Sequence, residues 1–146
     1  MRIAHLSDLH FSKFSISPRQ FFSKRWLGSL NLLANRLFEF DKRRPFSLIK
    51  LLGSLGVTHV IITGDLTTTS LKKEYDIAKS FADLLKDHGI DLFIIPGNHD
   101  HYTRSAYREK RFYDYFPSQF SHQTSFNLKD HGVMAYQLKK GWTIVG

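Results

Sequence analysis

Residues 94–100, IIPGNHD, join an apolar run to three consecutive polar side chains. The apolar run, Leu92–Ile95, predicts a buried strand, and Pro96 ends it because proline cannot donate a hydrogen bond to a neighbouring strand. Gly97 permits a sharp turn, since glycine adopts backbone angles that other residues avoid. An amide, an imidazole and a carboxylate then follow the strand, at the end where open α/β sheets place their functional sites. A polar turn that only caps the strand is the plainer alternative.

The same pattern occurs at two earlier places in the chain. A short strand predicted over Ile3–Leu6 leads to Asp8 and His10, and a second strand, Val57–Thr63, leads to Asp65. Helical segments between the strands favour a parallel sheet and an α/β fold class. Because the carboxyl ends of parallel strands meet at one edge of the sheet, we expect the three groups of polar side chains to converge there.

Helical periodicity fills the connections between the strands, and a hairpin is predicted near the end of the chain. A threonine- and serine-rich run, residues 67–70, offers N-caps for the helix that follows it. The predicted helices cover residues 20–40, 46–54, 71–88 and 104–116, and the later strands cover residues 90–95, 133–138 and 142–145.

Composition limits the chemistry and the compartment. The chain has 146 residues, the usual size of one domain, and contains no cysteine, so any metal site would use His, Asp, Glu or Asn. The N-terminus lacks the long apolar region of a signal peptide, and no apolar run reaches the ~20 residues that cross a bilayer. A cytoplasmic protein is the default expectation.

Positive charge is concentrated in one segment. Residues 19–50 carry eight basic and two acidic side chains, which accounts for six of the formal net charge of +8. We interpret residues 19–56 as a basic, aromatic helical insertion and favour a role as a cap that selects substrate. Contact with an anionic membrane surface or with nucleic-acid phosphates are alternatives, and so is an ordinary amphipathic helix with a solvated basic face.

The polar groups at the three strand ends are oxygen and nitrogen donors, which suit manganese, iron or zinc. Such donors can hold two ions about 4 Å apart, the arrangement used for in-line displacement at phosphorus. Three motifs occur in order along the chain: Asp8-x-His10, Gly64-Asp65 and Gly97-Asn98-His99-Asp100. Together they resemble the calcineurin-like metallophosphoesterase family, over Ile3 to about Tyr102.

The resemblance implies a layered α/β/β/α sandwich and metal-dependent hydrolysis of phosphomonoesters or phosphodiesters. By position, it implies that Asp8 and His10 bind a first divalent ion, that Asp65 bridges two ions, and that Asn98 binds the second. The nucleophile would be a hydroxide that bridges the two metals, because cations lower the pKa of bound water.

The resemblance also implies two catalytic residues. His99 would face the substrate phosphate, where it would stabilise charge or protonate the leaving oxygen. Asp100 would orient the ring of His99. His101 and Tyr102 directly follow the motif, and we weigh a place at the rim of the site against simple exposure or packing. The histidines outside the motifs are predicted to be structural or surface groups: His5, His59, His88, His122 and His131.

The chain departs from the family pattern in its later motifs. The family supplies further histidine ligands from a Gly-His and a Gly-His-x-His sequence, and this chain contains neither. The second ion would then keep only Asp65 and Asn98. We therefore interpret residues 1–146 as a metallophosphoesterase domain that is incomplete at its C-terminus, the first half of the sandwich. We expect weak metal binding and weak or absent hydrolysis from this chain alone. The alternative is a degenerate, non-catalytic module that keeps the fold and binds metal, phosphate or a partner.

Overall fold

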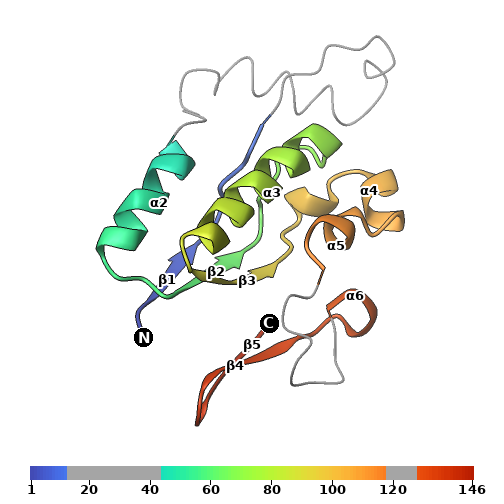
Figure 1. The fold of residues 1–146 in the computed structure, drawn as a ribbon. Coiled ribbons are helices and arrows are strands. Elements are labelled where there is room, and N and C mark those ends of the chain that lie inside the picture. Colours follow the sequence, from blue (N-terminus) through green and yellow to red (C-terminus); the bar gives the residue numbers. More distant parts are fainter. Residues whose placement is uncertain (13–43, 118–127) are drawn as a thin grey trace.

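A three-stranded parallel sheet forms the centre of the computed structural model, which describes residues 1–12, 44–117 and 128–146 (Figure 1). The strand order is β1-β2-β3, with Leu6 opposite Ile62 and Thr63 opposite Ile95 in the register. The strands are β1 (Ile3–Leu6), β2 (His59–Thr63) and β3 (Asp91–Ile95). The predicted parallel sheet and the α/β class are confirmed, and the three motif-bearing strand ends lie at the same edge.

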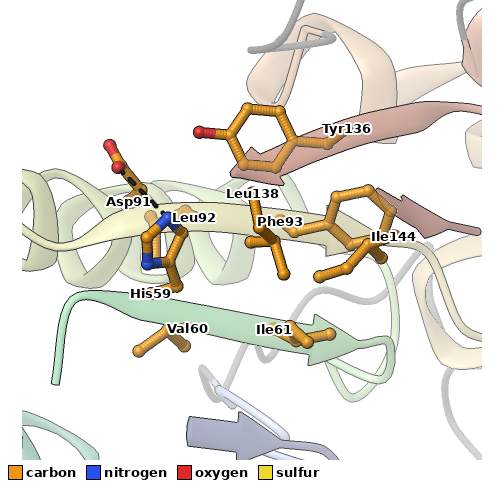
Figure 2. A pocket seen from close by; sticks show the side chains of 9 residues that line it. All are labelled: His59, Val60, Ile61, Asp91, Leu92, Phe93, Tyr136, Leu138 and Ile144. Carbon is orange, nitrogen blue, oxygen red and sulfur yellow. Dashed lines mark ion pairs between the residues drawn. The ribbon is translucent and has the colours of Figure 1, made fainter. Parts of the chain in front are cut away.

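An antiparallel hairpin covers one face of this sheet. It consists of β4 (Ala135–Lys139) and β5 (Trp142–Val145), as the sequence predicts, and is preceded by the short helix α6 (Leu128–His131). Figure 2 shows Tyr136 of the hairpin above Phe93 of β3 and Ile144 beside Phe93, at a small, mainly apolar hollow between the two layers. A second β layer on the sheet is consistent with the metallophosphoesterase sandwich.

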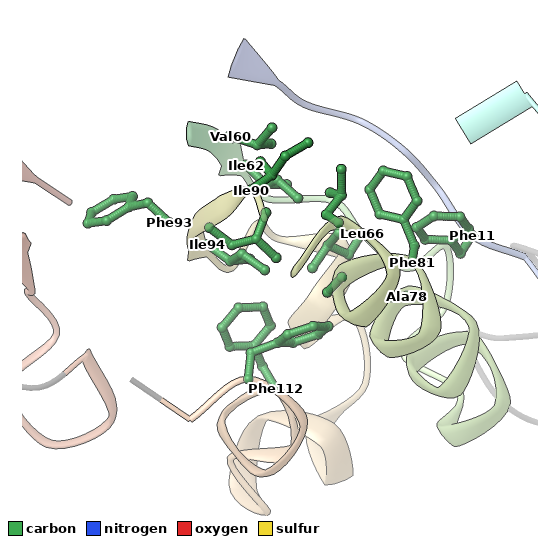
Figure 3. Close-up of a cluster of buried hydrophobic side chains, with 14 of the residues drawn as sticks. Phe11, Val60, Ile62, Leu66, Ala78, Phe81, Ile90, Phe93, Ile94 and Phe112 are labelled. Atoms are coloured by element: carbon green, nitrogen blue, oxygen red, sulfur yellow. The ribbon is translucent and has the colours of Figure 1, made fainter. Parts of the chain in front are cut away.

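Two longer helices cover the other face of the sheet, α2 (Arg44–Ser54) and α3 (Lys72–Asp87). The side chains alternate along each strand, so that Val60 and Ile62 of β2 are buried beneath the helices. Figure 3 shows Phe81 of α3 beside Phe11 in the same cluster, while Phe93 points away from α3 toward the hairpin. The main hydrophobic core therefore lies between the sheet and α3.

The start of α3 differs from the prediction. Its N-cap is Leu71, and none of the residues 67–70 caps the helix with its side chain. The buried carboxylate of Glu74 instead accepts hydrogen bonds from the backbone amides of Leu71 (3.1 Å) and Thr69 (2.9 Å). Of the four side chains, those of Thr67 and Ser70 bond to the loop that follows β3. The hydroxyl of Thr68 donates to the carbonyl of His10, and the hydroxyl of Thr69 donates to Glu74.

The segment after β3 is more broken than the single predicted helix. It contains a 3-10 turn, η2 (His99–His101), and two short helices, α4 (Arg104–Arg108) and α5 (Arg111–Tyr115). The two helices are separated at Lys110, whose φ of +50° cannot continue an α-helix. The helix predicted over residues 20–40 lies outside the described residues, so the interpretation of residues 19–56 as a basic insertion stays a prediction.

None of the helices in the described ranges is long and apolar enough to span a bilayer. Phe11 is only 3% exposed and forms a parallel bridge with Thr67. The chain after β1 therefore continues to pair with the chain after β2. This pairing places the residues between Leu6 and Phe11 against the Gly64-Asp65 motif.

Candidate metal centre

The loops that follow the three strands are bonded to one another at the carboxyl edge of the sheet. We call them the carboxyl-edge loops and define them as residues 7–11, 64–70 and 96–102. The amide of Asp8 donates to the carbonyl of Gly64 (3.3 Å), and the amide of His10 donates to the carbonyl of Asp65 (2.9 Å). The amide of His99 donates to Oδ1 of Asp65 at 2.9 Å. Residues that are far apart in the sequence are thus held in one small site.

Asp8, His10 and Asp65 form a group that could hold a metal ion. Each offers one ligand atom, and these atoms all lie within 4.8 Å of one another. Nε2 of His10 lies 3.6 Å from Oδ1 of Asp8. Asp8 is exposed, whereas His10 and Asp65 are partly buried, so the group is open to solvent on one side. Three of the four predicted metal ligands are therefore brought together.

The backbone at all three residues has an unusual conformation. Asp8, His10 and Asp65 have φ angles of 56°, 46° and 53°. Such left-handed conformations are uncommon outside glycine, although Asp, Asn and His adopt them more readily than most residues. Each costs on the order of 1–3 kcal/mol and persists only when the surrounding structure enforces it. The inter-loop hydrogen bonds supply that enforcement here.

Two glycines allow the loops to approach this closely. A Cβ atom at Gly97 would lie 2.2 Å from Oδ1 of Asp65. A Cβ atom at Gly64, whose φ is +96°, would lie 2.4 Å from the backbone nitrogen of Gly97. Neither position can accept a side chain without movement of the opposite loop. The glycine in each of these two motifs is therefore required by the packing of one motif on the other.

The imidazole of His99 lies beside the candidate metal group. Its Nδ1 is 2.8 Å from the carbonyl oxygen of Thr68. A carbonyl oxygen only accepts hydrogen bonds, so Nδ1 carries a proton and Nε2 is the nitrogen left for chemistry. The ring is edge-on to His10, with 5.0 Å between ring centroids. Asn98, the fourth predicted ligand, is exposed at the start of η2.

The structure corrects the expected route by which Asp100 acts. Its carboxylate does not meet the ring of His99, whose Nδ1 is held by Thr68. It is 0% exposed and accepts bonds from the amides of Gly97 (3.0 Å) and Thr67 (2.8 Å), and from the Thr67 hydroxyl (3.0 Å). Asp100 therefore links the loop of residues 64–70 to the loop of residues 96–102 through buried hydrogen bonds. Burial raises the pKa of this carboxyl, and the backbone hydrogen bonds from Gly97 and Thr67 oppose that shift.

Two further residues beneath the site carry no clear signal in the sequence. The hydroxyl of Tyr75, on α3, donates to the carbonyl of Asp100, and burial raises the pKa of this phenol. Ser70 is fully buried and contacts η2 through its hydroxyl. In the sequence, Tyr75 is one residue of the predicted helix 71–88, and Ser70 belongs to the run that offers N-caps. Only the folded arrangement shows that both support the loop that carries His99.

The other histidines make contacts that need no ligand role. His5 bonds to the hydroxyl of Thr63 (2.8 Å), and His59 lies 3.6 Å from Asp91 at the opposite end of the strands. His101 packs among the rings of Tyr107, Phe112 and Tyr113, and desolvation lowers its pKa. These contacts support packing over a rim role for His101. His122 lies outside the described residues.

An α/β domain with acidic and histidine side chains converging at its strand ends defines a candidate metallohydrolase. The family model described as calcineurin-like phosphoesterase matches residues 1–143. The chain therefore belongs to the calcineurin-like phosphoesterase family. A comparison with curated proteins finds no match.

Proposed function

We propose that this protein is a metal-dependent phosphoesterase that hydrolyses phosphomonoesters or phosphodiesters. The observation that carries the proposal is the convergence of Asp8, His10 and Asp65 beside the imidazole of His99. The family membership supports the same class of reaction. Two divalent ions of manganese, iron or zinc are the proposed cofactors.

The residues present fit a metal ion. Ligand atoms that bind one ion at ~2.0–2.2 Å lie at most ~4.4 Å apart. The three candidate ligand atoms lie within 4.8 Å of one another, so small side-chain rotations suffice for binding. Asp65 has a second oxygen for a neighbouring ion, and Asn98 is the proposed additional ligand there. When bound, the ions would lower the pKa of water and polarise the phosphoryl oxygens.

The fixed tautomer of His99 suits it to proton transfer at one atom. With Nδ1–H donated to Thr68, a protonated ring would present its second proton at Nε2 and could pass it to the leaving oxygen. The amide of His99 also donates to Asp65, which ties the position of the imidazole to that of the proposed bridging carboxylate. Asp100 acts indirectly in this proposal, by holding the turn from below.

The proposal is tested with Asp65→Asn in the chain of 146 residues. Binding of Mn²⁺ is measured by titration calorimetry, and hydrolysis is measured with p-nitrophenyl phosphate and bis(p-nitrophenyl) phosphate. We expect Mn²⁺ affinity to fall by more than ~10²-fold, because even partners outside the coordination shell contribute ~10–100-fold. Hydrolysis should be lost in the same variant and after treatment of the unsubstituted protein with a chelator.

Asp87→Asn is the matched control, because Asp87 is exposed at the last residue of α3. It should bind Mn²⁺ and hydrolyse both substrates as the unsubstituted protein does. Hydrolysis by Asp65→Asn at the unsubstituted level would contradict the proposed site. Tight Mn²⁺ binding without hydrolysis of either substrate would favour the non-catalytic binding module instead.

A further inference from the structure

Ser70 combines complete burial with a backbone conformation that favours glycine. It is 0% exposed, and its φ is +58°. A glycine would adopt this conformation without a steric penalty, whereas serine does so at a cost. Serine in place of glycine therefore indicates that the hydroxyl makes a specific contact, since the side chain does not stabilise this backbone conformation.

The hydroxyl of Ser70 is inserted into the turn that carries His99. It donates to the carbonyl of His99 and accepts from the amide of Tyr102, each at 2.8 Å. These two backbone groups are the partners that close η2, and their direct bond is long, at 3.4 Å. The serine hydroxyl therefore bridges a turn whose own hydrogen bond is weak.

The same turn sets the orientation of the imidazole. The ring of Tyr102 stacks on the ring of His99, with 5.6 Å between centroids and 12° between planes. The carbonyl that holds Nδ1 of His99 belongs to Thr68, two residues before Ser70. The loop of Ser70 thus contacts the ring directly through Thr68, and fixes the backbone of the stacked tyrosine through the serine hydroxyl.

Ser70 is itself held through its backbone carbonyl by a residue of α5. The guanidinium of Arg111, at the start of α5, donates to the carbonyl of Ser70 at 2.7 Å. Arg111 is only 7% exposed and pairs with Glu109. A buried, charge-assisted hydrogen bond is among the stronger ones in a protein, so it resists displacement of the loop.

We propose that Ser70, held by Arg111, is a positioning residue for His99: its hydroxyl fixes the turn from His99 to Tyr102 and thereby the orientation of the imidazole. The effect on catalysis rests on the proposed function, whereas the effect on the turn does not. The test therefore has one arm without metal or substrate and a second arm with both.

Ser70→Gly removes the hydroxyl and relaxes the backbone, so a loss cannot be ascribed to strain. Ser54→Gly, at the exposed last residue of α2, is the matched control. In the metal-free protein, we expect the Tyr102 amide of Ser70→Gly to exchange its hydrogen about tenfold faster, the equivalent of one lost hydrogen bond. Nitrogen NMR of the neutral His99 ring should show a mixture of tautomers instead of the single Nδ1–H form. Unchanged exchange and an unchanged tautomer would overturn the proposal.

With Mn²⁺ and p-nitrophenyl phosphate, we expect kcat of Ser70→Gly to fall at least about tenfold, within the range that general acid catalysis contributes. KM and Mn²⁺ affinity should stay within about twofold, because the hydroxyl contacts neither the metal group nor substrate. If kcat and Mn²⁺ affinity fell by the same factor, the proposal that Ser70 acts specifically on His99 would be overturned. If the unsubstituted protein hydrolyses nothing, the proposed function fails, and the metal-free arm still decides the role of Ser70.

Arg111→Lys serves as a second variant should Ser70→Gly not fold. It keeps a positive charge near Glu109 but loses the planar fork that reaches both partners. The hydrogen-exchange rate of the Tyr102 amide should also rise in this variant, by a smaller factor than in Ser70→Gly. If the exchange rate of an unrelated amide, such as that of Val60 in β2, rose by the same factor, the variant would be globally destabilised and the proposed coupling would be overturned.

Discussion

The carboxyl edge of the sheet and the face covered by the hairpin are stabilised in different ways. At the carboxyl edge, buried polar groups make directional hydrogen bonds between loops, and non-glycine residues adopt left-handed conformations. On the face covered by the hairpin, partly buried apolar side chains such as Tyr136 and Ile144 pack over a hollow. Directional hydrogen bonds fix the positions of side-chain atoms to a fraction of an ångström, which a metal site needs. Apolar packing tolerates larger displacements. The sensitivity of the two regions to small changes should therefore differ strongly.

The largest effect is expected from one methyl group at the carboxyl edge. Gly97→Ala would place a Cβ 2.2 Å from Oδ1 of Asp65, which is closer than any real contact. The loop must move, so we expect loss of measurable Mn²⁺ binding and a stability loss of more than ~3 kcal/mol, at the upper end for overpacking. Calorimetric titration and chemical unfolding measure the two effects.

Gly53→Ala is the matched control for this substitution. Gly53 lies in α2, and an added Cβ there meets nothing within 4 Å. Alanine at a helical position should stabilise the protein by ~0.5–1 kcal/mol and leave Mn²⁺ binding unchanged. If Gly97→Ala behaved like Gly53→Ala, the close approach of the two motifs would not be a condition for the site.

A second, intermediate effect is expected from the buried carboxylate below the site. Asp100→Asn would turn an amide N–H group toward backbone donors of Gly97, Leu66 or Thr67, so we expect a loss of ~1–3 kcal/mol at neutral pH. Burial raises the pKa of Asp100 in the folded protein, so the folded state binds the proton more tightly than the unfolded state does. The favourable contribution of this carboxyl is thus complete below its unfolded pKa of ~3.9 and declines as the pH rises through the folded value.

The stability difference between the unsubstituted protein and Asp100→Asn should therefore narrow as the pH rises above ~4. Urea unfolding of both proteins across the acidic and neutral range measures it. A difference that widens with pH would mean that the hydrogen bonds from Gly97 and Thr67 outweigh burial and lower the pKa. Asp87→Asn, at an exposed position, should show no comparable trend.

The sequence predicts the strands and the convergence of the candidate metal ligands, but it does not predict the contacts that support the site. The strand Ile3–Leu6 and the hairpin strands were predicted at or near their observed bounds, because apolar runs bounded by turn residues carry a strong local signal. The convergence of Asp8, His10 and Asp65 follows from three parallel strands ending at one edge. Patterns of this kind depend only on residue type and spacing.

The supports of the site depend on groups that the sequence does not distinguish. The acceptor for Nδ1 of His99 is a backbone carbonyl, and every residue has one. The role of Ser70 arises from a left-handed turn and from a partner 29 residues away. Similarly, Asp100 was expected to act on the adjacent side chain, because sequence neighbours suggest contact, whereas its carboxylate accepts from Leu66 and Thr67 in the loop after β2 and from the backbone of Gly97. Tertiary pairing of loops decides these contacts.

The smallest effect is expected on the hairpin face. Ile144→Ala removes a partly buried side chain that lines the hollow between β5 and the sheet. Full burial of such a side chain would make the loss in unfolding free energy ~2–5 kcal/mol, but Ile144 is only partly buried, so we expect ~1 kcal/mol. Mn²⁺ affinity and the tautomer of His99 should not change, because the residues around Ile144 in this hollow belong to β2, β3 and the hairpin and none belongs to the carboxyl-edge loops. A change in Mn²⁺ affinity of tenfold or more, about 1.4 kcal/mol, would show that apolar packing on this face also sets the geometry of the site.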